Sequence, residues 1–221
     1  MSAIVGPPHE PSEAAKHSGP AACGGSGPMK RASTWDLPTS LEIGDVGFAI
    51  NTDFRTVLYV LGVFGDPEYE PDEQAAVCIQ VMIEDWEKLP AERYRQALEA
   101  LMEFIDGPGA GEDRKRPRPR TMDWEQDAPL LIPAVNRVLG QEIRTLPYLH
   151  WWTFLGAYME VGECLFSTVV GLRQKKAKGK KLEKHEQEFC RENRALVTLR
   201  KKMTAREREQ KDELRELFGM R

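Results

Sequence analysis

The feature that most constrains the fold is a long apolar stretch between Leu149 and Leu172. A run of this length could cross a bilayer as a single helix. However, Glu160 and Glu163 fall near its centre, where an ionised side chain costs about 2.5–3.5 kcal/mol on insertion scales. The stretch is therefore predicted to be the central helix of a soluble core, with other elements packed against several of its sides.

Two adjoining faces of this predicted helix carry large side chains. The simplest interpretation is that both faces belong to the core. An alternative is that part of one face stays open and receives a helix of another protein. One face carries Trp152, Leu155, Met159, Gly162, Phe166 and Val169, and the other carries Trp151, Phe154, Tyr158 and Leu165. The candidate residues for docking a partner are Trp124, His150, Trp151, Trp152, Phe154 and Tyr158.

A short β-hairpin is predicted near the N-terminal side of the helices. Between residues 41 and 50 apolar and polar residues alternate in two short runs, and Gly44-Asp45 separates the runs. Glycine adopts positive φ without steric cost, so this pattern predicts a hairpin turn. A lone hairpin is marginal in water and must pack on helices. The predicted fold class is mostly α: a compact helical domain with a small N-terminal β-hairpin and a charged C-terminal helical arm.

Apolar residues at helical spacing predict three helices after the hairpin. Side-chain capping, proline at a first helical position and glycine-proline stops mark their ends. The first begins at Thr52 or Asp53 and ends before Gly65. The second runs from Pro71 to Trp86, and the third runs from Pro90 or Ala91 to Ile105.

The segment after these helices is rich in proline and basic residues. Residues 107–120 predict an extended linker. Asp123 is then expected to cap a helical turn, with Gln126 reaching back as in a capping box. Pro129 and Pro133 predict a break or kink before a helix of about two turns ending at Gly140.

The chain ends are predicted to differ from the core. Residues 1–34 are rich in Gly, Pro, Ser and Ala, which predicts a disordered leader, and translation could start at Met1 or at Met29. The core is assigned to 35–175 and the charged helical arm to 176–221. Within the arm, Leu182–Met203 and Thr204–Leu217 are predicted to be weakly amphipathic helices.

The charge is divided unevenly along the chain. The net charge is −4, yet residues 173–221 hold 17 Lys and Arg against 9 Asp and Glu. Basic runs at 114–120 and 173–184 are candidates for phosphate contacts. Neither run contains aromatic residues for base stacking, so a solvated surface is the simpler interpretation and nucleic-acid binding is not expected.

No set of residues with catalytic or metal-binding spacing stands out. The four cysteines form no C-x-x-C pair, as suits a reducing cytoplasm. Glu160 and Glu163 lack an accompanying Glu-x-x-His, so a di-iron site is not expected. His150 is expected to pair with Asp123 or Asp127 and to join two motifs. We therefore predict a protein that is not an enzyme and that holds no metal or cofactor.

The tryptophan motifs carry a resemblance to a known family. Their order is Glu84-Asp85-Trp86, then Asp123-Trp124-Glu125-Gln126-Asp127-Ala128-Pro129, then Leu149-His150-Trp151-Trp152-Thr153-Phe154, followed by a basic helical tail. Over roughly residues 36–203 the chain resembles the phage gene-product-fifteen family, which occurs in tail-morphogenesis modules of siphophages and prophages.

The resemblance implies a tail assembly chaperone in the cytoplasm of a bacterial host. Its implied partners are the tape measure protein and the tail tube protein, and self-association is a further expectation. The family implies no catalytic residues. Two alternatives remain open at this point: a permanent component of the virion tail or connector, and a nucleic-acid-associated accessory protein that acts through the basic arm.

Overall fold

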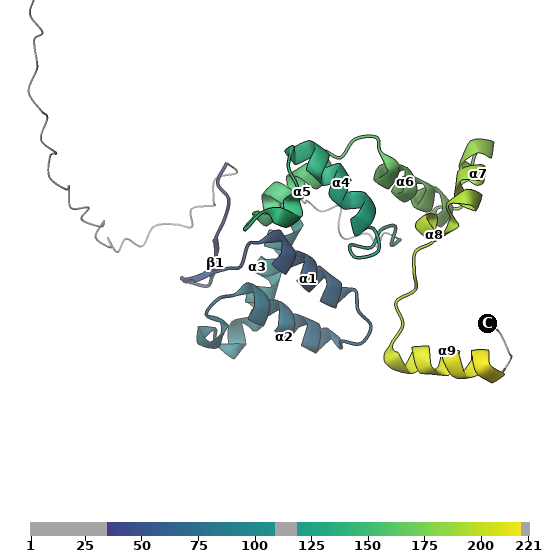
Figure 1. Ribbon diagram of the computed structural model, residues 1–221. Helices are drawn as coiled ribbons and strands as arrows, with labels where there is room; N and C mark the ends of the chain where they lie inside the picture. The colour runs from purple at the N-terminus through teal and green to yellow at the C-terminus, as the bar shows by residue number, and fades with distance from the viewer. Residues whose placement is uncertain (1–34, 109–118, 218–221) are drawn as a thin grey trace, which may run out of the picture.

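The computed structural model describes residues 35–108 and 119–217 (Figure 1). It is mostly α-helical, with one two-stranded antiparallel sheet near its N-terminal side, so the predicted fold class is confirmed. The predictions for the leader and for most of the basic linker lie outside the described residues. The α-helices are α1 (Phe54–Phe64), α2 (Pro71–Met82), α3 (Tyr94–Asp106), α4 (Ala128–Leu139), α5 (Trp151–Met159), α6 (Leu165–Ala177), α7 (Lys184–Glu192), α8 (Arg194–Val197) and α9 (Ala205–Leu217).

The hairpin forms where the alternating pattern predicts it. Strands β1 (Ser40–Ile43) and β2 (Val46–Ala49) pair in register from Ser40–Ala49 to Ile43–Val46. The turn uses Gly44 at φ 67°, as a tight turn requires. Ile43 is fully buried, and the Arg93 guanidinium donates a hydrogen bond of 2.8 Å to its carbonyl oxygen.

The first three helices form a layer that supports the hairpin. α1 packs on α2, α2 packs on α3, and α3 packs on β1. Asp53 caps α1 by accepting from the backbone N–H of Arg55, and Pro71 occupies the first turn of α2, both as predicted. Two short 3₁₀ turns, η1 (Trp86–Lys88) and η2 (Ala91–Arg93), connect α2 to α3.

The predicted long helix over Leu149–Leu172 is wrong in one respect: two helices replace it. α5 ends at Met159 and α6 begins at Leu165, and residues 160–164 connect them. Ser167 hydrogen-bonds both the N–H and the carbonyl oxygen of Cys164, which starts α6 as a new helix. The break leaves Glu160 and Glu163 exposed to water rather than inside a buried helix.

The break predicted at Pro129 and Pro133 is also wrong, because α4 runs without interruption through Pro133. Pro129 lies in the first turn, where a backbone N–H has no partner within the helix in any case. Pro133 removes a single hydrogen bond of the helix, to the carbonyl of Pro129, and its ring is exposed. The predicted end at Gly140 is correct, since this glycine adopts the left-handed conformation at φ 69°.

The C-terminal region is less helical than predicted. Leu182–Met203 contains α7 and α8 and then an extended segment, rather than one helix. α6 crosses the boundary predicted at residue 175 between core and arm, and α8 packs on α6. Figure 1 shows α9 standing apart from the other helices at the end of this extended segment. Throughout residues 35–108 and 119–217, no helix has the length and apolar character needed to span a bilayer.

Candidate functional site

The two tryptophan motifs meet in one aromatic cluster at the centre of the molecule. Phe154 stacks on Phe54 with ring centroids 4.8 Å apart and on Trp151 at 5.6 Å. Trp124 brings the first motif to the second and lies 5.3 Å from the ring of Tyr158. Trp151 and Phe154 are only 1% and 2% exposed, whereas Trp124 and Tyr158 are partly buried.

The paired tryptophans of α5 also close the end of α3. The indole N–H of Trp151 donates to the carbonyl oxygen of Ile105 at 2.7 Å, and that of Trp152 donates to Phe104 at 2.9 Å. Carbonyl groups in the last turn of a helix have no partner inside the helix. The Trp151-Trp152 pair therefore supplies hydrogen bonds as well as apolar area, which gives both residues a role within the fold.

His150 does not pair with Asp123 or Asp127, so that prediction is wrong. Its Nδ1 accepts the backbone N–H of Trp152 at 3.0 Å and thereby caps α5. Its Nε2 lies 3.0 Å from the carbonyl oxygen of Pro38 and donates to it, because a carbonyl can only accept. His150 thus joins the start of α5 to the segment before β1, and it is 3% exposed.

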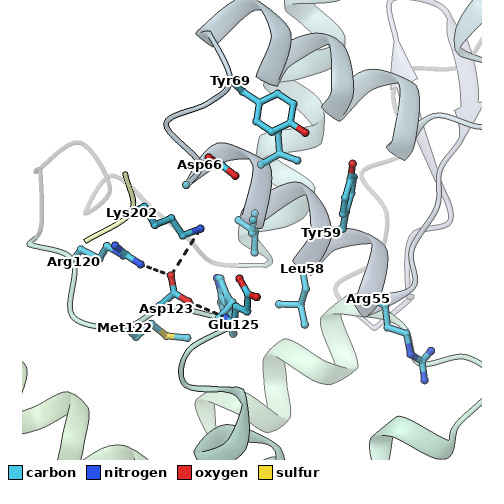
Figure 2. A pocket seen from close by; sticks show the side chains of 15 residues that line it. Arg55, Leu58, Tyr59, Asp66, Tyr69, Arg120, Met122, Asp123, Glu125 and Lys202 are labelled. Carbon is cyan, nitrogen blue, oxygen red and sulfur yellow. Dashed lines mark hydrogen bonds and ion pairs between the residues drawn. The ribbon is translucent and has the colours of Figure 1, made fainter. Parts of the chain in front are cut away.

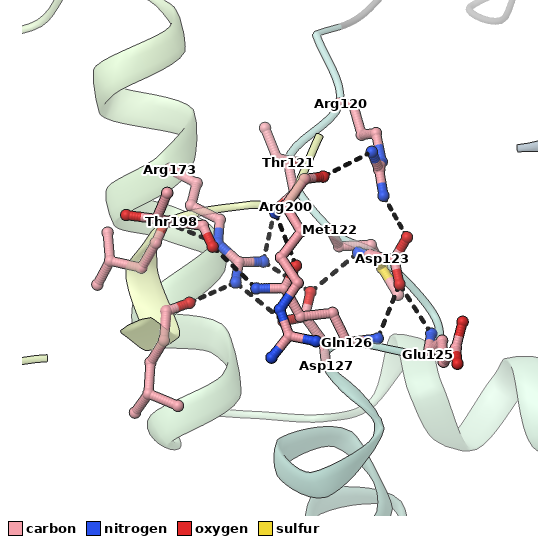
Figure 3. Close-up of polar contacts among 12 residues, drawn as sticks. Arg120, Thr121, Met122, Asp123, Glu125, Gln126, Asp127, Arg173, Thr198 and Arg200 are labelled. Atoms are coloured by element: carbon pink, nitrogen blue, oxygen red, sulfur yellow. Dashed lines mark hydrogen bonds and ion pairs between the residues drawn. The ribbon is translucent and has the colours of Figure 1, made fainter. Parts of the chain in front are cut away.

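Asp127 instead pairs with Arg173 on α6. The two carboxylate oxygens accept from the guanidinium at 2.6 and 2.9 Å, and the side chains are 2% and 4% exposed. The remaining donors of Arg173 reach the carbonyl oxygens of Thr121, Leu196 and Val197. All five N–H donors of the guanidinium are therefore used. We call this arrangement the Arg173 clamp (Figure 3).

The same corner holds the extended C-terminal segment. The Gln126 side-chain amide donates to the carbonyl of Thr198 at 2.8 Å and accepts from the N–H of Arg200 at 2.9 Å. Gln126 therefore pairs with the backbone of this segment and does not complete the predicted capping box. Asp123 does cap the turn, since it accepts from the backbone N–H of Gln126 at 2.7 Å.

The charge of Asp123 is stabilised by its neighbours. Burial alone would raise the pKa of this carboxyl. The hydrogen bond from Gln126 and the nearby cations of Arg120 and Lys202 outweigh burial and hold the pKa below its ordinary value. Asp123 therefore stays ionised at neutral pH and keeps Arg120 and Lys202 beside it.

An open groove runs between this corner and α1. It has a volume of about 500 Å³. We call it the α1 groove. Figure 2 shows Tyr59 and Tyr69 on one side and the Arg120, Asp123 and Lys202 group on the other. Tyr59 is 54% exposed and Tyr69 is 37% exposed. The walls of the α1 groove also include Leu58, Leu61, Met122 and Trp124.

The groove combines features of a surface that holds another chain. Apolar side chains form its walls, tyrosines offer both ring and hydroxyl, and paired charges border it. Such combinations are typical of protein interfaces. Across the described parts of the chain, no group of three or more His, Cys, Asp or Glu side chains is placed to hold a metal ion. Burial raises the pKa of the Cys78 thiol to about 12, so this thiol is a poor nucleophile.

Of the six predicted docking residues, Trp124 is the one that lines the α1 groove. His150, Trp151 and Phe154 are almost fully buried among residues of this chain, while Trp152 and Tyr158 are partly buried. Sequence reasoning missed Tyr59 and Tyr69. Tyr59 lies on the exposed side of α1, where an aromatic residue is a usable signal, whereas Tyr69 lies in the turn before α2 and offers no such signal.

The fold and the groove define a small, mostly α-helical protein with an open groove beside α1. Residues 34–199 match the family described as Bacteriophage Gp15 protein, and the chain belongs to this family. Neither a curated protein nor a solved structure gave a match to the chain.

Proposed function

We propose that this protein is a phage tail assembly chaperone that binds the tape measure protein in the bacterial cytoplasm and has no catalytic role. Membership of a phage family supports a role in the phage life cycle. The α1 groove supports a binding role, because it is open, largely apolar and bordered by exposed tyrosines. The groove is the single observation that favours binding over a purely architectural part.

The chemistry of the groove suits an amphipathic helix. An apolar stripe of such a helix fits against Leu58, Leu61 and Trp124, and its polar flank meets Arg120 and Asp123. The tape measure protein is long and helix-rich in the family's implied role, so it offers many such stripes. Moderate affinity at each stripe is sufficient, because the chaperone must leave when the tail tube forms around the tape measure protein.

Co-expression with the tape measure protein of the same phage tests the proposal. The expected result is a soluble complex that contains several copies of this chain. Tyr59→Ala and Tyr69→Ala should weaken binding about tenfold or more, because exposed tyrosines at the centre of an interface contribute about 1–2 kcal/mol each.

Tyr94→Ala is the matched control for Tyr69→Ala. Tyr94 is also 37% exposed, but it lies on α3 and does not line the groove. It should leave binding unchanged. Equal effects of the two substitutions would place the binding surface elsewhere. A tape measure protein that stays insoluble, together with this chain in purified virions, would favour the alternative of a permanent tail component.

A further inference from the structure

A second groove lies between α6 and α7. It has a volume of about 340 Å³, and Leu172 and Phe189 form its apolar walls. Gly171 lies on it, and a Cβ built on this glycine would meet no atom within 4 Å. The groove is therefore open above the α6 backbone. We call it the α6–α7 groove.

The turn that joins α6 to α7, beside this groove, is rich in lysine. Residues 174–184 contain six lysines and one glutamate. Lys175 pairs with Glu186 at 2.5 Å, and both residues line the groove. Among the described residues, five exposed lysines form no ion pair: Lys176, Lys178, Lys180, Lys181 and Lys184. We call these five the lysine cluster.

The position of the lysine cluster is not explained by helix electrostatics alone. Lys176 lies in the last turn of α6, where the helix dipole favours a cation. Lys184 lies in the first turn of α7, where the dipole disfavours one. The cluster therefore concentrates positive charge in a place where the fold gains little from it.

The hairpin end of the molecule has the opposite character. Val46 follows the tight turn of the hairpin and is 52% exposed, although it is apolar. Around it the described structure holds several carboxylates and few cations. Near the turn, Glu42, Asp45 and Glu92 are exposed and form no ion pair in the described structure, and the neighbouring cation is Arg93, which lies against Gly44.

Figure 1 shows the hairpin and α7 at opposite ends of the helical body, so one copy cannot bring its own two ends together. We propose that the α6–α7 groove binds the hairpin tip of a second copy of this chain, with Val46 against Leu172 and Phe189 and with Glu42, Asp45 and Glu92 facing the lysine cluster. The contact joins two different surfaces, so it is head-to-tail and can be repeated along a row of copies.

A contact built from one hairpin tip and one small groove buries less area than a stable dimer needs. Association is therefore weak and sensitive to salt. Sedimentation equilibrium should show an average mass that rises with protein concentration at about 0.01 M salt and stays at the monomer value at about 1 M salt, where charges are screened within a few ångström.

Charge reversal provides the decisive test. The triple variant Lys178→Glu, Lys180→Glu, Lys181→Glu should be monomeric at low salt, and so should the triple variant Glu42→Lys, Asp45→Lys, Glu92→Lys. An equal mixture of the two should associate again, because each reversed end now finds a complementary reversed end. All six positions are exposed, so the fold should tolerate the changes.

The groove itself is tested by Gly171→Leu, because a Cβ at this position enters open space and the longer side chain should occupy the groove. This variant should weaken association about tenfold or more at low salt. Gly156→Leu is the matched control, because Gly156 is a helical glycine of α5 that also faces open space. The proposal is overturned if the chain stays monomeric at low salt, if Gly171→Leu leaves association unchanged, or if the mixed reversed variants do not associate.

This inference does not depend on the proposed function. The reversed variants leave the α1 groove intact, so binding of the tape measure protein by monomeric variants is measured separately. Loss of self-association with retained tape measure binding supports the head-to-tail contact alone. Retained self-association with no tape measure binding leaves this inference standing and removes the proposed function.

Discussion

At the residue scale, Arg173 uses its side chain for five hydrogen bonds. It joins three segments that are far apart in the sequence: the turn before α4, α6 itself and the end of α8. A buried ion pair is not by itself a source of stability, because removing both charges from water is costly. Removing one partner is more damaging, since it leaves the other charge buried alone.

Arg173→Met is therefore expected to lower the free energy of unfolding by about 3–5 kcal/mol, measured by urea denaturation. Adding Asp127→Leu should recover part of this loss, because the double variant leaves no unpaired buried charge. Lys176→Met, on an exposed position of the same helix, serves as the control and should change stability by less than about 0.5 kcal/mol. A loss of under about 1 kcal/mol for Arg173→Met would mean that the pair is accessible to water.

The sequence places Arg173 in a basic surface run because Lys175 and Lys176 follow it closely. Helical spacing contains the missing signal: Arg173 follows Val169 by four residues and so shares its buried face. The burial of Trp151 and Phe154 could be predicted from apolar spacing. Their hydrogen bonds to the end of α3 could not, because that contact joins residues about 46 positions apart in sequence.

At the element scale, the hairpin, α1 and α9 follow local patterns, and the prediction places them correctly. The break between α5 and α6 was missed because apolar residues continue at helical spacing across it. The signal for the start of α6 is weaker in sequence, because it rests on the hydrogen bonds between Cys164 and Ser167. The extended segment after α8 was missed because its partners, Gln126 and Arg173, lie far away in the sequence.

Pro133 gives a test of how α4 tolerates an internal proline. Pro133→Ala restores one backbone donor and should raise the free energy of unfolding by about 1–3 kcal/mol. A smaller loss opposes this gain, because proline restricts the unfolded chain and alanine does not. Pro129→Ala, in the first turn of the same helix, should bring no comparable gain, because its N–H has no helical partner. Thermal unfolding of the two variants decides the matter, and equal midpoints would show that the ladder around Pro133 is not strained.

At the scale of the whole molecule, the described chain divides at the extended segment rather than at the start of the arm. α8 belongs with the core, because Val197 is 4% exposed and Arg173 holds its carbonyl oxygen. α9 touches the core through Glu68, which pairs with Arg208 at 3.7 Å, and its described side chains are exposed.

Two truncated chains separate these parts. A chain that ends at Thr204 should keep the thermal midpoint of the full chain, because it retains the residues that match the family and every contact of the Arg173 clamp. A chain that ends at Lys181 should unfold several degrees lower, since Arg173 loses two carbonyl acceptors and Val197 no longer covers α6. Similar midpoints for the two shorter chains would show that α8 is not part of the cooperative unit.

The Arg173 clamp has a consequence for how the sequence can vary. Arg173 binds Leu196 and Val197 through their backbone carbonyls, and Gln126 binds the carbonyl oxygen of Thr198 and the backbone N–H of Arg200. Side chains with exposed positions in this stretch can therefore change without loss of the contact. Substitutions are therefore tolerated unequally on the two sides of the contact. Asp127, Arg173 and Gln126 need their own side chains to make the hydrogen bonds, whereas the segment that they bind needs only to keep its backbone conformation.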